Sequence, residues 1–269
     1  MDASHVELRV LSSPREIDAC IALQREVWGA EFAEVVPRTI LMISQRIGGV
    51  LAGAFGPGDE LVGFVFGLTG VGKDGRLVHW SDMAAVREPY RDRGIGRRLK
   101  EFQRALLEPL GVTRVLWTFD PLVARNAHLN LNRLGARVVE YVPDMYADTG
   151  SPLHRGLGTD RFLVEWEIGP GASGPAPLPP ASDAPIVNRR PDAAGDAELA
   201  VDLPPDAPLV RVEIPDDIRA VQLSSPDTAA KWRASTRPAF LTLLQRGYRV
   251  AGFTRDADAQ RCFYVLEKQ

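Results

Sequence analysis

Residues 87–104 carry the feature that most restricts the fold of this chain: two glycines inside a run of positive charge, directly before a predicted helix. Gly94 and Gly96 follow a predicted strand over 77–86 and lie at the start of a predicted helix over about 94–108. Glycine lets the backbone turn sharply and lets a ligand approach without a Cβ in the way. A helix N-terminus points unpaired N–H groups outward and carries a partial positive charge. The segment therefore predicts a strand–loop–helix junction that holds phosphate.

The positive charge of this segment is local. The whole chain has a net charge of −3, which argues against a general nucleic-acid binder. A solvated helix face is the alternative interpretation of such a run. Next to a helix N-terminus, however, the three arginines Arg91, Arg93 and Arg97 complete a cradle for a diphosphate.

Two other phosphate-binding motifs do not fit. Gly67 and Gly72-Lys73 have the spacing of a Walker loop, but Asp74 stands where Ser or Thr must reach magnesium, and a strand follows instead of a helix. The Gly94-x-Gly96 pair lacks the third glycine of a dinucleotide fingerprint, and the strand before it is not the first of the chain.

Composition excludes further classes of protein. The two cysteines, Cys20 and Cys262, lie far apart and predict reduced thiols, and no Cys/His cluster has the spacing of a metal site. The N-terminus has no charged-then-apolar leader, and no apolar run is long enough to span a membrane. We therefore expect a cytoplasmic protein without a metal and without a membrane partner.

A proline-rich stretch divides the chain. Residues 169–208 hold ten of its 21 prolines and predict an extended, poorly ordered linker. The linker separates a body, 1–168, from a tail, 209–269, which is marginal in size for independent folding. We expect the tail to dock either on the body or on a second subunit. In the second case the protein would be a homodimer.

The body predicts a mixed α/β sandwich with the order β-α-α-β-β-β-α-β-α-β-β. A capping box at Ser13 to Glu16 opens the first helix, Pro37 opens the second, and Gly135 ends a helix over about 124–134. The predicted strands of the body are 6–10, 50–55, 61–68, 77–86, 113–119, 136–142 and 160–168. In the tail, a strand over 209–214 precedes a helix opened by Ser225-Pro226 and two strands after Gly247.

The stretch "SDMAAVREPY" followed by "RDRGIGRRL" resembles the acyl-CoA-binding motif of the GCN5-related N-acetyltransferase (GNAT) superfamily, whose core element order matches the body. The resemblance implies acetyl-CoA or another acyl-CoA as co-substrate. It also implies that the end of the strand pairs with the pantetheine arm and that the loop binds the pyrophosphate. Carried over, these roles fall on Ala84, Ala85 and Val86 for pantetheine, and on Arg91, Asp92, Arg93, Gly94, Ile95, Gly96 and Arg97 for phosphate.

Four further segments resemble a poorly characterised bacterial branch of predicted acetyltransferases: "TFDPL", "NAHLNLNRLGA", "LHRGLGTDRFLVEW" and "WRASTR". Kinship with that branch implies an amino acid as acceptor and succinyl-CoA as an alternative donor. Within the tail, Arg233 and Arg237 lie one helical turn apart. They predict either a carboxylate grip or ordinary surface and domain-contact charges.

Acyl transfer from a thioester to an amine needs a base, an oxyanion donor and a proton for the departing thiolate. In the family, the amine and the thioester meet where two parallel strands splay apart, at 77–86 and 113–119 in this chain. A backbone N–H near Met83 or Ala84 would face the oxyanion. Asp82 is the first candidate base and His79 the second. On a regular strand they point to opposite faces, so they serve together only if a bulge intervenes.

The residue at the position of the family's general acid departs from the family pattern. Leu131 stands where the family commonly has a tyrosine, so either the thiolate leaves without help or Tyr146 or Tyr141 replaces it. On the same helix, Asn126 and Asn130 are predicted to hydrogen-bond pantetheine, with helix capping as the alternative for Asn126.

The sequence thus predicts an acyl-CoA-dependent N-acyltransferase that acts on a small amine. One alternative is a non-catalytic acyl-CoA-binding regulatory module, which the missing tyrosine favours. Acetylation of basic protein tails ranks lower, since no acidic run adjoins the site in sequence.

Overall fold

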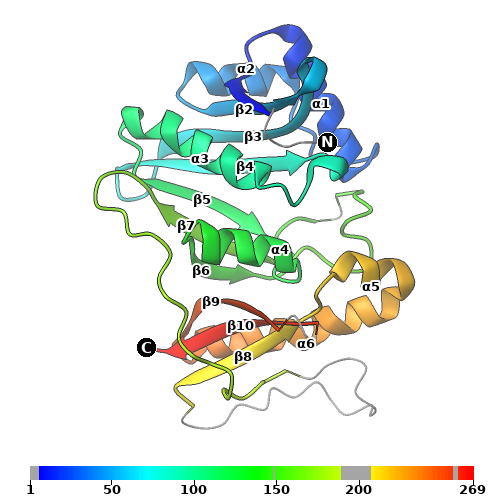
Figure 1. The fold of residues 1–269 in the computed structure, drawn as a ribbon, viewed down its shortest axis with the longest axis vertical. Helices are drawn as coiled ribbons and strands as arrows, with labels where there is room; N and C mark the ends of the chain where they lie inside the picture. The colour runs from blue at the N-terminus through cyan, green and yellow to red at the C-terminus, as the bar shows by residue number, and fades with distance from the viewer. Residues whose placement is uncertain (1–5, 148, 189–206, 257–259) are drawn as a thin grey trace. The chain divides into compact units, whose positions relative to one another are not determined.

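The computed structural model describes residues 6–147, 149–188, 207–256 and 260–269, and it divides into two compact units (Figure 1). The first unit comprises Met1–Trp117, Thr149–Pro152 and Glu165–Ala172. The second comprises Thr118–Asp148, Leu153–Val164 and Ser173–Gln269. The division falls within the expected body rather than at 168 and 209, and whether 1–168 folds alone stays a prediction.

The first unit is a mixed sheet with helices on both faces. Its strands follow the order β1-β2-β3-β4-β5; the first four are antiparallel neighbours and β5 is parallel to β4. The strands are β1 (Glu7–Val10), β2 (Val50–Gly56), β3 (Glu60–Val71), β4 (Leu77–Val86) and the first part of β5 (Arg114–Phe119). The helices are α1 (Pro14–Trp28), α2 (Arg38–Arg46) and α3 (Ile95–Leu107), with short 3-10 turns η2 (Pro57–Asp59), η3 (Glu88–Tyr90) and η4 (Glu108–Leu110).

Local signals in the sequence position these elements. The capping box forms: the Ser13 side chain accepts from the Glu16 N–H, and the Glu16 carboxylate accepts from the Ser13 N–H. The β2–β3 hairpin is confirmed, with left-handed Gly58 and Asp59 in its turn. Strand β3 runs to Val71, three residues beyond the expected end, because it continues to pair with the start of β4.

The two faces of this sheet pack against different helices. Phe64 and Phe66 belong to the apolar cluster that includes Ile17 and Leu23 of α1. Gly63 faces the other way, since a Cβ built on it would lie 3.3 Å from Cδ1 of Leu99 in α3. Helix α3 therefore covers the face opposite α1.

The second unit joins the chain after Thr118 to the C-terminal region. It carries the last part of β5, α4 (Ala124–Ala127), the π-helical turn η5 (His128–Arg133), β6 (Arg137–Val142) and most of β7 (Arg161–Glu167). Its strand β7 lies between β5 and β6. A separate three-stranded sheet has the order β8-β10-β9, and two helices accompany it. The strands of this sheet and its two helices are β8 (Leu209–Ile214), α5 (Ile218–Ser224), α6 (Pro226–Gln245), β9 (Tyr248–Asp256) and β10 (Arg261–Lys268).

Two expectations for this unit need correction. The helix expected over 124–134 is a short α-helix continued by a π-helical turn, although Gly135 ends it as predicted, in the left-handed region. The proline-rich segment is not wholly extended and unpacked: Ile186 forms a bridge with Arg211, and Val187 and Asn188 are buried. Residues 189–206 of the predicted linker lie outside the described residues.

An aromatic core holds the second unit together. The Phe162 ring centroid lies 4.8 Å from that of Phe240 in α6 and 5.4 Å from that of Tyr264 in β10, both in edge-on geometry. Tyr141 packs on Phe162 at 5.5 Å. Such pairs add to the stabilisation from burial.

Among the described residues, no helix of either unit has the length and apolarity that a bilayer crossing requires.

Candidate active site

The loop between β4 and α3 has the backbone geometry of an anion site. Gly94 caps α3 with φ 75° and ψ 1°, and Asp92 also has a positive φ of 59°. Two left-handed residues so close together bend the chain sharply, and glycine adopts this conformation without strain. Nothing lies within 4 Å of the position that a Gly94 Cβ would take, so the space above the loop is open.

The N-terminus of α3 is electrostatically uncompensated. No side chain caps it, and its first turn has no acidic residue. The other long helices differ: α1 has Glu16 and α6 has Asp227 in the first turn. The N–H groups and partial positive charge of α3 therefore favour an anion.

The arginines around this loop differ in orientation. The Arg91 Nε donates to the Val86 carbonyl at 3.0 Å, and Arg93 lies 5.8 Å from the Tyr90 ring centroid. Arg97 pairs with Glu101 at 2.8 Å on the exposed side of α3. Arg98 points away, since its Nη2 donates to the Val6 carbonyl. The three arginines that were predicted to hold phosphate, Arg91, Arg93 and Arg97, thus lie on the loop or in the first turn of α3.

One edge of β4 is available beside the loop. The residues predicted to contact pantetheine, Ala84 to Val86, pair with β3 on one side. On the other side, β4 pairs with β5 through His79 with Val115 and Trp80 with Leu116. Within the described residues, pairing with β5 therefore ends before the alanines, and an extended arm would find backbone groups there.

A bulge interrupts β4 between its two candidate bases. From Phe66 to Leu68, β3 advances two residues while β4 advances three, from Met83 back to Trp80. Because of the extra residue, Ser81 and Met83 lie on opposite faces of the sheet although they are two positions apart. Ser81 contacts α3, whereas Met83 belongs to the apolar cluster that includes residues of α1.

Asp82 and His79 lie on opposite faces despite this bulge. Asp82 accepts a hydrogen bond from Trp80 Nε1 at 3.2 Å, whereas His79 faces α3. Desolvation raises the pKa of Asp82; the Trp80 hydrogen bond opposes this shift, and the nearby Glu34 carboxylate adds to it. The side chain of Asp82 is nonetheless exposed, so an amine can reach it.

His79 is fully engaged in a buried hydrogen-bond chain. Thr69 Oγ1 donates to the Gly48 carbonyl, so it accepts from His79 Nδ1 at 2.9 Å. His79 Nε2 then accepts from Gln103 Nε2 at 3.0 Å. Burial, and secondarily Lys100, lower the pKa of His79 to about 3, so the ring stays neutral. This geometry favours a role in packing and leaves Asp82 as the better candidate base.

The same chain reaches two side chains that the sequence analysis did not single out. Ser81 Oγ donates to Gln103 Oε1 at 2.9 Å and accepts from Lys100 Nζ at 2.7 Å. Lys100, Gln103 and Leu107 recur at helical spacing on the buried face of α3, and a lysine on such a face was the available signal.

The remaining predicted residues belong to the second unit. Tyr146 OH lies 3.0 Å from Thr118 Oγ1, its N–H donates to Thr159 Oγ1 at 3.0 Å, and the Arg161 guanidinium lies 5.3 Å from its ring centroid. Tyr141 donates to Asp160 instead. Its burial, and then that hydrogen bond, raise its pKa far above the ordinary value.

On the helical segment of this unit, two asparagines and a leucine carry predictions. Asn126 lies inside α4, whose cap is Val123, so it does not cap that helix. Asn130 and Leu131 are buried in η5.

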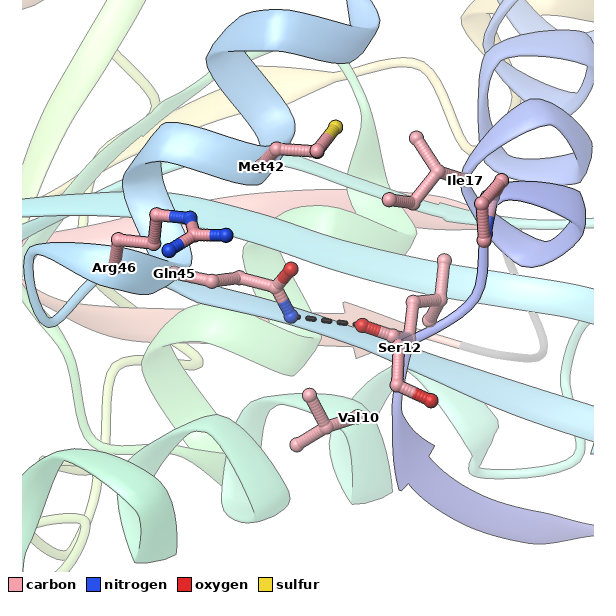
Figure 2. A pocket seen from close by; sticks show the side chains of 8 residues that line it. Val10, Ser12, Ile17, Met42, Gln45 and Arg46 are labelled. Atoms are coloured by element: carbon pink, nitrogen blue, oxygen red, sulfur yellow. Dashed lines mark hydrogen bonds between the residues drawn. The ribbon is translucent and has the colours of Figure 1, made fainter.

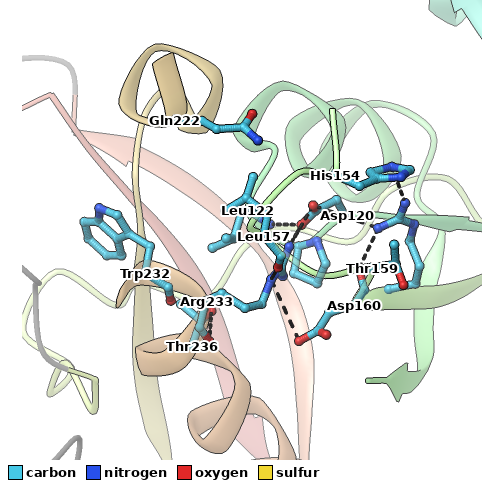
Figure 3. A network of polar contacts seen from close by, with 12 residues as sticks. Asp120, Leu122, His154, Leu157, Thr159, Asp160, Gln222, Trp232, Arg233 and Thr236 are labelled. Carbon is cyan, nitrogen blue, oxygen red and sulfur yellow. Dashed lines mark hydrogen bonds and ion pairs between the residues drawn. The ribbon is translucent and has the colours of Figure 1, made fainter. Parts of the chain in front are cut away.

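A polar network in the second unit surrounds Arg233, as Figure 3 shows. Arg233 Nη2 donates to both oxygens of Asp120 at 2.7 Å, and its Nε donates to the Leu157 carbonyl at 2.9 Å. Arg237 pairs with Asp144 and Asp160. Asp120 also accepts from the Leu122 N–H at 2.8 Å, as a turn residue does. Of the two interpretations of Arg233 and Arg237, the contacts favour the second, since both arginines of the predicted tail pair with carboxylates of the predicted body.

A groove of about 370 Å³ opens elsewhere on the first unit (Figure 2). Its lining comes from β1, α1 and α2, including Val10, Ile17 and Met42, and Gln45 Nε2 donates to the Leu11 carbonyl across it. No residue of the β4–α3 loop lines this groove, so we do not assign it to the anion site.

No family model matches the chain, and a comparison with curated proteins gives no match either. Among solved structures, NAA60 from Arabidopsis thaliana in complex with a bisubstrate analogue has 17% identity and a TM-score of 0.50, covering 62% of this chain and 99% of that chain. The ribosomal-protein-S18-alanine N-acetyltransferase from Escherichia coli has 18% identity and a TM-score of 0.46, with 62% and 97% covered. YncA from Salmonella typhimurium, a putative acetyltransferase with acetyl-CoA, has 14% identity and a TM-score of 0.48, with 65% and 100% covered. At such identities the likeness concerns the fold alone, and the match to NAA60, at a TM-score of 0.50, confirms the predicted α/β GNAT fold.

Proposed function

We propose, from this GNAT fold and the loop it carries, that the protein is an acyl-CoA-dependent N-acyltransferase. Its product would be the N-acetyl or N-succinyl derivative of a small amine, in particular of an amino acid. The observation that carries the proposal is the uncapped N-terminus of α3, with left-handed Gly94 before it and the β4 edge beside it. A cytoplasmic location and a homodimer remain expectations from the sequence.

The binding roles follow from the loop. The N–H groups of residues 94–97, together with Arg91 and Arg93, would hold the pyrophosphate. The backbone of Ala84 to Val86 would pair with pantetheine, and Asn126 and Asn130 are proposed as further contacts to it. Asp92 supplies the second left-handed residue that turns the chain toward the ligand.

The chemistry needs a neutral amine. Asp82, directly or through a water molecule, would take the proton from the ammonium form of the acceptor, because its pKa is raised toward the working range of a base. The amine then attacks the thioester carbonyl, and the bulged backbone near Met83 and Ala84 would donate an N–H to the oxyanion. Collapse of the intermediate breaks the C–S bond, and Tyr146 is proposed to protonate the thiolate.

The first test targets the loop. In the full chain, replacing Gly94 and Gly96 together by valine strains the left-handed cap and covers the N–H groups, so acyl-CoA affinity should fall by at least about 100-fold, the loss of two charge-assisted hydrogen bonds. Gly111→Val is the matched control, since Gly111 has φ 79° and equally open space. Calorimetry measures the affinity, and circular dichroism verifies folding. Unchanged affinity in the double variant would contradict the proposal.

A non-catalytic acyl-CoA-binding module is the second candidate, and the buried Leu131 at the usual tyrosine position favours it. Incubation of the protein with acetyl- or succinyl-CoA and a pool of amino acids separates the two candidates. An enzyme forms N-acyl products and free thiol, whereas a module binds the thioester without turnover.

A further inference from the structure

A side chain of α3 bridges two neighbouring strands at the point where they stop pairing. Within the described residues, the pairing of β4 with β5 ends at Trp80 and Leu116. Ser81 and Trp117 are the next residues on the two strands. Lys100 Nζ donates to Ser81 Oγ at 2.7 Å and lies 4.0 Å from the Trp117 ring centroid. Lys100 therefore connects the two strands directly beyond their last pair.

The bulge of β4 begins at the same serine. Two residues of β4, Ser81 and Asp82, lie opposite the single residue Gly67 of β3. A Cβ on Gly67 would lie 2.3 Å from His79 Nε2, which is closer than real Cβ atoms approach another atom. The α3 face of the bulge is therefore tightly packed, and glycine is the residue that fits opposite it.

Helix α3 supplies a second contact to the bulge. Ser81 Oγ accepts from Lys100 and donates to Gln103 Oε1 at 2.9 Å, so two side chains of α3 hold its hydroxyl. Gln103 Nε2 in turn donates to His79 Nε2 at 3.0 Å. All four side chains are buried. A fully satisfied polar chain in a dry interior is rigid, so it fixes the backbone of β4 at Ser81.

Stability alone does not account for a lysine at this position. A buried ammonium is costly without a counter-charge, and among the described residues no carboxylate forms an ion pair with Lys100. Its partners are a hydroxyl and the Trp117 ring. Burial accordingly lowers the pKa of Lys100 to about 7. A residue in so costly a position indicates a role in function, and the structure that it holds is the bulge.

We propose that Lys100 is a positioning residue of the acyl-transfer site, because it holds the β4 bulge through Ser81 and the adjoining part of β5 through Trp117. The inference rests on the proposed function, in which Asp82 acts on the amine and the backbone near Met83 on the oxyanion. Lys100 lies on the α3 face of β4 and Asp82 on the other, so Lys100 acts on the reaction through the bulge. It keeps the oxyanion donor at one distance from the thioester carbonyl. Such a donor is effective only within hydrogen-bonding distance, so a small displacement of the bulge slows the reaction.

The experiment separates catalysis from acyl-CoA binding and from folding. In the full-length protein, Lys100→Met keeps the apolar volume against Trp117 and leaves Ser81 its hydrogen bond to Gln103. Replacing a buried charge by an apolar side chain of similar volume is often neutral or stabilising, so the urea midpoint should stay or rise. The turnover rate should fall at least about ten-fold, because the bulge loses one of its two contacts to α3.

Turnover is measured as release of free CoA from saturating acetyl- or succinyl-CoA, whichever the wild type uses, with the pool of amino acids. The affinity for the same thioester is measured by calorimetry. It should stay within about two-fold of the wild type, since the β4–α3 loop that holds the phosphates is unchanged.

Two matched controls accompany the variants. Lys73→Met, in the exposed turn between β3 and β4, should keep the wild-type rate. Ser81→Ala removes the hydroxyl through which Lys100 acts and should slow turnover at unchanged affinity. Its control is Ser44→Ala, because Ser44 is also buried but donates to the Leu41 carbonyl within α2. When Ser81→Ala and Lys100→Met are combined, the loss should be smaller than the product of the single losses, since both remove one contact.

A Lys100→Met rate equal to that of the wild type overturns the inference. A slower rate accompanied by weaker thioester binding or by a lower urea midpoint also overturns it, because a purely structural role has that result. Losses that multiply in the combined variant refute the route through Ser81. If Lys100→Met does not fold, the comparison of Ser81→Ala with Ser44→Ala decides. If the wild type turns over neither thioester, the proposed enzyme fails and the inference falls with it; if the wild type is active and Lys100→Met matches it, the inference alone fails.

Discussion

Arg233→Met is the substitution whose consequence the structure specifies most fully. Arg233 is 5% exposed and projects from α6 into the second unit. Its Nη2 supplies the hydrogen bonds to both oxygens of Asp120, and its Nε supplies one to the Leu157 carbonyl. Methionine fills similar apolar volume but donates nothing. Among the described residues, Asp120 then keeps the Leu122 N–H and, at 3.9 Å, the Arg161 guanidinium.

The expected destabilisation follows from these lost partners. Removing one member of a buried ion pair leaves an uncompensated charge and costs about 3–5 kcal/mol. The estimate applies because Asp120 is only 13% exposed at the side chain. With a urea m-value of about 2–3 kcal/mol per M, the midpoint of unfolding should fall by about 1–2.5 M.

Equilibrium urea unfolding, followed by tryptophan fluorescence and circular dichroism, measures this loss. Arg255→Met is the matched control from the same unit, because Arg255 pairs with Asp216 at 2.6 Å while 59% exposed, and exposed pairs contribute at most about 1 kcal/mol. A midpoint for Arg233→Met within error of the wild type, at equal m, would refute the view that this ion pair holds α6 in the second unit.

Three further predictions concern the candidate site. Asp82→Asn should lower kcat at neutral pH, and the wild-type rate should fall as the pH drops through the raised pKa of Asp82, above the ordinary value of about 4; an unaltered pH–rate profile in the variant removes Asp82 as the base. His79 has a lowered folded pKa, so the unfolded chain binds the extra proton below about pH 6.5, and the free energy of unfolding should fall by about 2 kcal/mol between pH 6.5 and 5. His79→Gln should lack this contribution, and equal pH dependence of unfolding would disprove it. Tyr146→Phe keeps the ring beside Arg161 and should lower kcat by about 100-fold without changing acyl-CoA affinity; an unchanged kcat excludes a general acid there.

Much of the candidate site was predictable because its signals are local. The Gly94-x-Gly96 spacing, the preceding strand and the following helix act within a dozen residues, and the loop in the structure has the geometry that they predict. The bulge in β4 was not predictable, since it depends on pairing with β3. The charge environment of Lys100 was equally hidden, because it depends on which residues of two other strands lie against α3.

The sequence by itself determined the strand–loop–helix junction at Gly94, the hairpin, the capping box and the mixed α/β class, because turn residues and periodicity act between near neighbours. The tertiary structure decided where the chain divides and what the C-terminal helix does. Arg233 and Arg237 pair with Asp120, Asp144 and Asp160, which lie 77 to 113 residues earlier in the chain. No local pattern encodes such partners, since the choice between a surface arginine and a buried one is made only when distant segments exclude water together.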